Sequence, residues 1–274
     1  MSQLNPLTKY FRQPKLFIQL PSKGLNYPAG VLQGDYNNVP IFGMTGMDEL
    51  LFKTPDALYN GEASIKVIES CCPFITNAKV MPNIDVDTVL IAIRMATFGE
   101  NMTISHTCKN CGEENNFDIP LRNIIDYFSS IAFETKISVN PDINVKLRPL
   151  TYEESTMFSV ENFKLQRTLY QVRGLTEAEQ NEHLSEIYSR LAAIQVELFM
   201  LSIESVQLPD VEVTDKEHIK EWLKNSDNSV YKIIKDQLEK NKTIWDIPKQ
   251  NIQCAACQTD DTVSISLDQS NFFG

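Results

Sequence analysis

Two short cysteine pairs constrain the fold of this chain more than any other feature of its sequence. Cys108 and Cys111 form one Cys-x-x-Cys pair, and Cys254 and Cys257 form a second pair far along the chain. A Cys-x-x-Cys turn directs two thiolates at one point, and two such turns supply the four soft ligands of a tetrahedral zinc site. The sequence therefore predicts one structural zinc per chain, with these four cysteines as its ligands.

Strand-like sequence flanks both pairs, which favours a zinc ribbon, a fold in which one metal joins two β-hairpins. The flanking segments are residues 102–106, 116–119, 249–253 and 262–267. Ordinary ribbons separate their pairs by about 15 to 20 residues, whereas residues 112–253 lie between these two pairs. One shared zinc would make those residues an insertion whose ends are held together. Two unrelated knuckles, reduced thiols and a redox pair are alternatives that the motif leaves open.

The remaining composition is typical of a globular protein. Of the 274 residues, 42% are hydrophobic and 22% are charged, which fits one or two soluble domains. No apolar run is long enough to span a bilayer, and no signal peptide is recognised, so we expect the protein to fold in a cytoplasm. Six cysteines in that setting indicate thiols or metal ligands. Cys71 and Cys72, outside the pairs, are interpreted as small buried hydrophobic residues.

The charge of the chain is unevenly distributed. The formal net charge is −11. Residues 1–34 contain Lys9, Arg12, Lys15 and Lys23 but no acid, so they carry +4 and the rest carries −15. An acidic body repels a phosphate backbone, which argues against nucleic-acid binding. A basic segment on such a body suits docking onto an acidic protein surface, and a solvated charge imbalance is the alternative.

The N-terminal part is predicted to be rich in loops. Residues 1–13 show neither helical nor strand periodicity and are expected to form an extended arm. Short helices are predicted at residues 47–52 with Thr45 as N-cap, from Pro55 onward, and at residues 63–71.

One helix, at residues 86–98, is apolar on nearly every face, and such a helix is a buried one. Arg94 is its exception, because an unpaired buried charge is costly. Asp85, Asp87 and Glu100 are the expected partners of Arg94 in a structural ion pair.

The segment between the two cysteine pairs is expected to be mainly helical. After a short helix at residues 120–130, alternating residues predict two strands. Long helices follow, and residues 173–176, with Thr176 and Glu179 as a capping box, separate them. The predicted strands are 135–139 and 144–147, and the predicted helices are 152–172, 177–205, 214–224 and 227–240. The apolar spacing of three and four in the second long helix predicts a helical hairpin.

These elements predict an α+β fold: a loop-rich N-terminal region, a buried helix and a split zinc ribbon that carries a long helical insertion. The expected divisions are an arm at residues 1–13, an α+β core with the first zinc hairpin at 14–130, a helical insertion at 131–247, and the second zinc hairpin with a C-terminal tail at 248–274. Phe272 and Phe273 are expected to pack into the core.

Motifs for catalysis are not found in the sequence. We recognise no phosphate loop, dinucleotide fingerprint, nucleophile elbow or His-Glu-x-x-His helix. His106, His183 and His218 fall in three different elements; His106 either contacts the zinc site or is a surface strand residue. Four cysteine ligands leave no open coordination position, so we do not expect an enzyme.

A series of motifs in the N-terminal half resembles one protein family. In order these are Leu20–Gly24, Met44–Leu50, Lys53–Leu58, Asn60-Gly61, Ile91–Arg94 with Phe98-Gly99, and then Cys108–Cys111. This succession resembles the T-even-type bacteriophage baseplate hub family of contractile-tailed phages. The likeness covers residues 14–130, and more loosely the pattern from Cys254 to Phe273.

The resemblance implies a non-enzymatic virion or assembly protein of the tail baseplate hub, assembled in the host cytoplasm. Its implied partners are other phage baseplate and tail proteins, with a homo-oligomer as a further possibility, and neither nucleic acid nor a membrane span. A zinc-ribbon adaptor in transcription or nucleic-acid processing is the alternative function.

Overall fold

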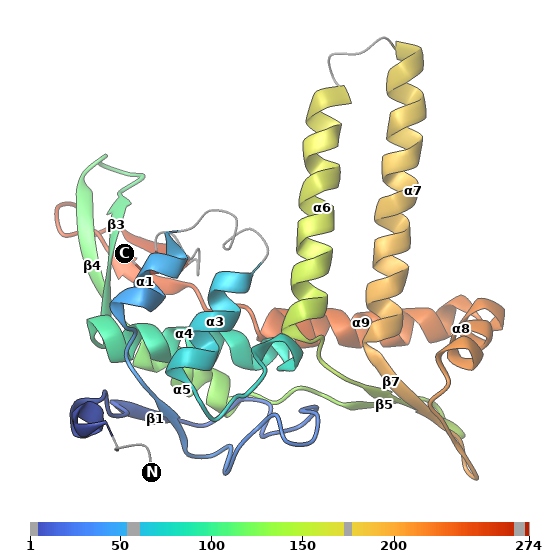
Figure 1. Ribbon diagram of the computed structural model, residues 1–274. Coiled ribbons are helices and arrows are strands. Elements are labelled where there is room, and N and C mark those ends of the chain that lie inside the picture. Colours follow the sequence, from blue (N-terminus) through green and yellow to red (C-terminus); the bar gives the residue numbers. More distant parts are fainter. Residues whose placement is uncertain (1–4, 54–60, 173–176, 266–271, 274) are drawn as a thin grey trace. The chain divides into compact units, whose positions relative to one another are not determined.

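The computed structural model describes residues 5–53, 61–172, 177–265 and 272–273 of the chain, without the side chains of residues 177–182. The chain forms two compact units, which we call the core unit, Met1–Ile131 with Ile247–Gly274, and the helical unit, Ala132–Asp246. Helices and small sheets occur together in the described residues (Figure 1), so the predicted mixture of helix and strand is confirmed. The Pro55 helix and the Thr176 capping box lie outside the described residues.

The core unit contains short strands and helices around one long helix. Its elements in chain order are η1 Pro6–Tyr10, β1 Leu16–Ile18, β2 Val39–Ile41, α1 Gly46–Phe52, α3 Glu62–Cys71, η2 Ala78–Val80, α4 Asn83–Phe98, β3 Asn101–Thr107, β4 Glu114–Pro120, α5 Arg122–Ser130, β9 Gln250–Gln253 and β10 Asp260–Val263.

Helix α4 is the centre of the core unit. It packs against β1, β2, α3 and α5, and most of its side chains are buried, as predicted. The helix ends at the C-cap residue Gly99, which has a φ of 102° and whose N–H donates to the Met95 carbonyl. Arg94 does not find the expected acid: no carboxylate of the described residues lies within 4.0 Å of it. Instead it donates to the carbonyl oxygens of Phe272 (2.8 Å) and Asn101 (3.3 Å).

A buried carboxylate fixes the loop that follows β1. Asp85, fully buried in the first turn of α4, accepts the backbone N–H of Ser22 at 2.7 Å and its hydroxyl at 2.5 Å. The Tyr27 hydroxyl donates to the same carboxylate at 2.9 Å. Burial nevertheless dominates and raises the pKa of Asp85 to about 6, while the bonds from Ser22 act in the opposite direction.

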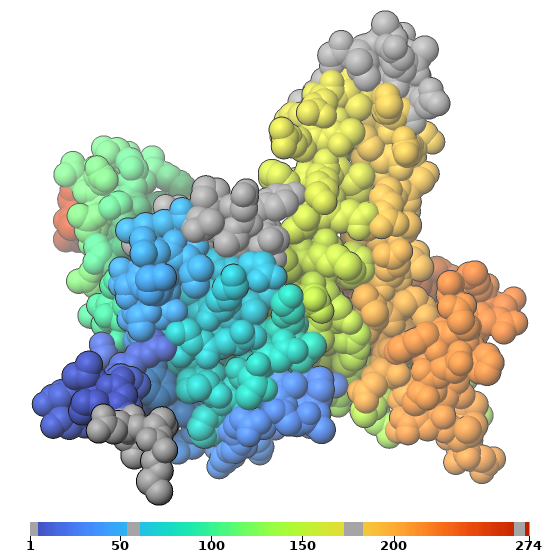
Figure 2. Space-filling model, in the orientation of Figure 1, coloured from blue at the N-terminus to red at the C-terminus, as the bar shows by residue number. Residues whose placement is uncertain are grey.

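The N-terminal segment is not extended throughout, contrary to the sequence-based expectation. Pro6–Tyr10 forms a 3-10 helix because the Asn5 side chain caps it and Pro6 fits its first turn. None of its residues is buried, and it lies at the surface of the core unit (Figure 2). Arg12, within the predicted arm, contacts the core unit through its side chain.

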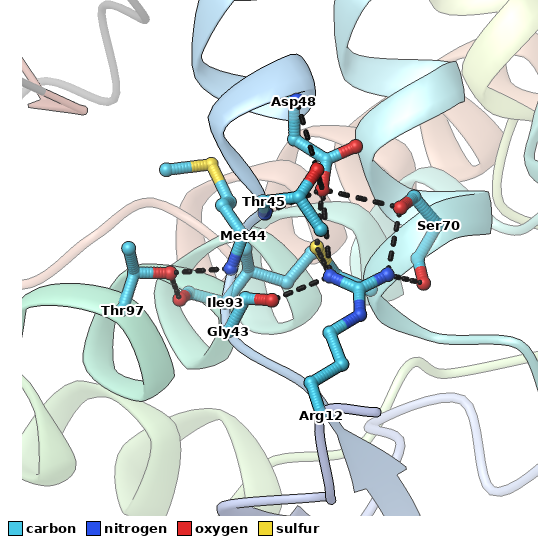
Figure 3. A network of polar contacts seen from close by, with 9 residues as sticks. Arg12, Gly43, Met44, Thr45, Asp48, Ser70, Ile93 and Thr97 are labelled. Carbon is cyan, nitrogen blue, oxygen red and sulfur yellow. Dashed lines mark hydrogen bonds and ion pairs between the residues drawn. The ribbon is translucent and has the colours of Figure 1, made fainter. Parts of the chain in front are cut away.

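Arg12 joins three parts of the core unit that are distant in sequence (Figure 3). Its guanidinium donates to the Gly43 carbonyl at 2.5 Å, and to the Ser70 carbonyl at 2.6 Å and hydroxyl at 2.8 Å. It also lies 3.4 Å from the Asp48 carboxylate. The predicted N-cap Thr45 is confirmed, and the Asp48 carboxylate forms a capping box of α1 with it.

The C-terminal phenylalanines pack into the core unit, as predicted. Phe272 is 1% exposed and Phe273 is 7% exposed. The Phe273 ring stacks on Phe52 of α1 at a centroid distance of 4.4 Å. The Arg94 guanidinium lies over the Phe272 ring at 5.4 Å, so the arginine contacts both the backbone and the ring of this residue.

The helical unit combines a four-stranded antiparallel sheet with four helices among its described residues. Its elements are β5 Lys136–Asn140, β6 Ile143–Leu147, α6 Tyr152–Val172, α7 Glu177–Leu201, β7 Ile203–Gln207, β8 Glu212–Val213, α8 Lys216–Asn225 and α9 Asn228–Ile244. The strand order is β5-β6-β7-β8. Helices α8 and α9 contribute Ile219 and Ile234 to a hydrophobic core that also contains Val145 of β6 and Val206 of β7.

The predicted helix over 177–205 is too long. Helix α7 ends at Leu201, and residues 203–207 form β7, which pairs with both β6 and β8. Ile203, Ser205 and Val206 are buried there. Pairing with two neighbouring strands outweighs the local helical pattern of these residues.

Candidate metal centre

The four cysteines lie at the turns of two antiparallel β-hairpins. In the first hairpin, β3 and β4 pair from Asn101↔Pro120 to Thr107↔Glu114. In the second, β9 and β10 pair from Val263↔Gln250 to Asp260↔Gln253. The two hairpins lie side by side in the core unit (Figure 1), although residues 121–249 separate them in sequence.

Both cysteine turns have the same backbone geometry. The N–H of Cys108 donates to the Glu113 carbonyl at 2.9 Å, as the N–H of Cys254 donates to the Thr259 carbonyl at 3.0 Å. In each turn the residue after the second cysteine donates back to the carbonyl of the first, at 2.9 Å in both. That residue has a left-handed φ, 76° at Gly112 and 58° at Gln258. The two pairs are therefore two copies of one turn.

The four sulfurs meet at one point. Cys108 Sγ lies 3.6 Å from Cys257 Sγ, and Cys111 Sγ lies 3.7 Å from Cys254 Sγ. All four sulfurs lie within 4.8 Å of one another. A disulfide requires about 2.05 Å, and all four are free cysteines.

These distances fit a tetrahedral metal. Zinc–sulfur bonds of about 2.3 Å place neighbouring sulfurs of a tetrahedron about 3.8 Å apart. The structure therefore brings together all four predicted ligands, each pair facing the other pair, in an arrangement compatible with one zinc ion. Four thiolates around zinc would cross-link the two hairpins and leave no coordination position for a substrate.

The second turn favours the thiolate forms that a metal requires. Hydrogen bonding with the Thr259 side chain and backbone lowers the pKa of Cys257 to about 5, with Cys257 Sγ 3.2 Å from Thr259 Oγ1. The backbone N–H groups of Cys257 and Ala256 lower the pKa of Cys254. At Cys111 the Glu113 backbone lowers the pKa, but hydrogen bonding with the other three sulfurs outweighs it and the pKa is raised. Metal ligation needs deprotonated cysteine, and the positive charge of a soft divalent cation would favour the thiolate form of all four.

Sequence reasoning missed Asn115, a buried residue of β4 that lies between the two turns. Its Nδ2 donates to Cys254 Sγ at 3.5 Å and to the Glu113 carbonyl at 3.1 Å. Its Oδ1 accepts the N–H of Ala255 at 3.0 Å. A single asparagine in a polar strand gives no signal of this role, because both partners in the second turn are far away in sequence.

A second polar contact joins the hairpins on their outer side. Asp261 of β10 accepts from Lys109 Nζ at 3.1 Å and lies 3.0 Å from His106 Nε2. The N–H of Thr262, then Lys109 and His106, lower the pKa of Asp261 to about 2. His106 is thus a strand residue that contacts the opposite hairpin.

Cys71 and Cys72 stay outside the cluster. Both are fully buried, as predicted. Burial raises the pKa of Cys71 to about 11 and that of Cys72 to about 12, so both remain neutral thiols at neutral pH. Cys72 packs as a small apolar side chain, whereas the Cys71 sulfur also lies 3.5 Å from Arg12 Nη1 and 3.8 Å from Asp48 Oδ2.

Among the described residues, no helix combines the length and apolar character needed to cross a bilayer.

Comparison with known proteins identifies the family. No curated protein and no solved structure matches the chain. A family model described as T4 bacteriophage base plate protein matches residues 44–274, which include both cysteine pairs and the helical unit. This match confirms the resemblance to phage baseplate proteins, while the hub assignment remains a prediction. The chain therefore belongs to the T4 bacteriophage base plate protein family.

Proposed function

We propose that this protein is a structural or assembly component of the hub region of a contractile phage tail baseplate, held in shape by one zinc ion. The family implies a place in the virion tail baseplate and other phage tail proteins as partners. The observation that supports a structural role is the four-cysteine cluster, because it joins two distant segments and would leave the metal no open coordination position for a substrate.

The proposed zinc has a specific mechanical role. It holds together the two ends of the segment between the cysteine pairs. The helices of that segment are then available to contact neighbouring proteins. We retain the expected divisions at residues 1–13, 14–130, 131–247 and 248–274 as part of this proposal, with Arg12 as the residue that attaches the first of them to the core unit. A structural zinc of this kind contributes on the order of 10 kcal/mol to folding at neutral pH.

Two surfaces supply the contacts in this proposal. The first is the N-terminal segment, where Leu7, Tyr10 and Phe11 are 60%, 74% and 57% exposed. Lys9 and Lys15 are exposed beside them, with no carboxylate of the described residues within 4.0 Å. Exposed aromatic and cationic side chains in one segment suit docking onto an acidic protein.

The second surface is the hairpin of α6 and α7. Met157 and Phe163 of α6 are 53% and 52% exposed, and Tyr188 and Val196 of α7 are 61% and 56% exposed. A helical hairpin with this much exposed apolar surface is suited to packing against another protein.

The test is complementation of a phage that lacks this gene. We expect the wild-type protein to restore tails with complete baseplates in electron micrographs, and the double variant Cys111→Ser, Cys257→Ser to fail. Cys72→Ala, a change to a buried cysteine outside the cluster, is the matched control and should restore tails. Complete baseplates with the double variant would contradict the proposed role of the metal. Complete tails from the phage that lacks the gene, with no protein supplied, would contradict the proposed baseplate function.

The alternative is a zinc-ribbon adaptor in transcription or nucleic-acid processing, which the two cysteine turns also favour. Filter binding with duplex DNA and with RNA separates the two functions. With a net charge of −11, we expect no retention above background at any salt concentration. Affinity that falls steeply with added salt would favour the adaptor.

A further inference from the structure

The two cysteine turns contact each other through equivalent positions. Asn115 follows Cys108 by the same number of residues as Asp261 follows Cys254. Asn115 bonds to the second residue of the opposite turn, Ala255, and Asp261 bonds to the second residue of its opposite turn, Lys109. The exchange is therefore reciprocal, as expected for two copies of one turn packed face to face.

The two contacts differ in burial and in what they touch. Asp261 has a side chain 21% exposed and Lys109 has one 77% exposed, so solvent weakens that contact. Asn115 is only 9% exposed, and both ends of its amide are used. One end fixes the backbone of the second turn, and the other donates to the sulfur of Cys254.

We propose that Asn115 is a positioning residue of the metal centre, which controls how tightly the protein retains its metal. This inference rests on the proposed zinc site. The Oδ1 of Asn115 holds the Ala255 N–H, and this contact sets the position of Cys254 relative to the first hairpin. The Nδ2 donates to the Cys254 sulfur and offsets part of its charge when the thiolate binds a metal.

Physical chemistry supports both effects. Hydrogen bonds to an ionised acceptor are about twice as strong as neutral ones. Groups that orient metal ligands commonly change metal affinity by about 10- to 100-fold when they are removed. The buried amide of Asn115 both donates to the Cys254 sulfur and positions Cys254. We therefore expect its removal to change metal affinity by a factor in this range.

The experiment measures the release of zinc from the full-length protein to an excess of a coloured chelator. We expect Asn115→Ala to release zinc about 10- to 100-fold faster than wild type. Asn115→Asp keeps an acceptor for the Ala255 N–H but places a carboxylate beside the sulfur. It should therefore release zinc at least as fast as Asn115→Ala does. Asn116→Ala is the matched control, since the Asn116 side chain bonds to Ser105 of its own hairpin at 2.6 Å.

Cobalt substitution distinguishes this role from a general loss of stability. Loss of an N–H···S bond raises the energy of the sulfur lone pairs, so the sulfur-to-cobalt charge-transfer band should move to longer wavelength in both Asn115 variants. It should not move in Asn116→Ala. Release at the wild-type rate, or an unmoved band, in the Asn115 variants would overturn the inference.

Failure of this inference is distinguishable from failure of the proposed zinc site. A wild-type protein that takes up neither zinc nor cobalt refutes the site itself. If wild type and all variants take up one metal and release it equally fast, the site stands and the role of Asn115 is refuted.

Discussion

The guanidinium of Arg12 donates to the carbonyl oxygen of Ser70 at 2.6 Å, across 58 residues of sequence. This contact marks where the N-terminal segment ends and the fold begins. Residues before Arg12 contribute no buried side chain among those described, whereas the Arg12 side chain is only 32% exposed.

Arg12→Ala is expected to destabilise the protein. The change leaves the carbonyls of Gly43 and Ser70 without their charged donor, and a hydrogen bond to a charged group contributes about 1.5 to 3 kcal/mol. We expect the free energy of unfolding, measured by urea denaturation, to fall by about 2 kcal/mol. Deletion of residues 1–10 is the control and should leave it unchanged. Equal stability of Arg12→Ala and wild type would show that the contact carries no net free energy.

The burial of Asp85 predicts a pH dependence of stability. Its folded-state pKa is raised to about 6 from an ordinary value of 3.8. A raised pKa means that the contribution to stability is complete below pH 3.8 and is lost as the pH rises through 6. The full loss corresponds to about 3 kcal/mol.

The pH prediction is tested by comparing wild type with Asp85→Asn. The free energy of unfolding of wild type should fall relative to that of the variant between pH 4 and pH 6.5, because asparagine does not titrate. Parallel curves for the two proteins over this range would contradict a raised pKa at Asp85.

The left-handed residues of the two cysteine turns predict opposite effects of substitution. Gly112→Ala introduces a Cβ at φ 76° with no atom of the described residues within 4 Å of it, so the cost is confined to the backbone. We expect a loss of about 1 kcal/mol in thermal denaturation, and a gain of similar size for Gln258→Gly at φ 58°. A gain for Gly112→Ala would contradict the common geometry of the turns.

The C-terminal Phe272 is expected to carry substantial stability. It is 1% exposed and contacts Arg94 through both its ring and its carbonyl. Phe272→Ala should lower the free energy of unfolding by about 3 kcal/mol, as for other buried phenylalanines. Phe98→Ala, at a phenylalanine that is 48% exposed, is the matched comparison and should cost less. An equal loss for both variants would argue against a buried anchor at Phe272.

Local sequence patterns were sufficient to predict the elements that depend on interactions between neighbouring residues. The apolar run of α4, the N-cap Thr45 of α1, and the spacing of the cysteine pairs each depend on neighbouring residues. What sequence reasoning missed depends on distant partners. Strand β7 forms by pairing with β6 and β8, and Asn115 acquires its role only beside the second hairpin.

Arg94 shows the same limit. Its nearest acids in sequence were the natural candidates for an ion pair, but the fold offers a backbone carbonyl from Phe272 instead. The charged residues near Arg94 in sequence cannot predict a contact with a backbone carbonyl that lies far away in the chain.

One metal ion is proposed to close the four-cysteine cluster, and the metal content of the purified full-length protein tests this. Under reducing conditions with zinc supplied, elemental analysis should find one zinc per chain. The double variant Cys111→Ser, Cys257→Ser should hold none. A wild-type protein that is fully folded and free of metal would show that the cluster is not a structural metal site.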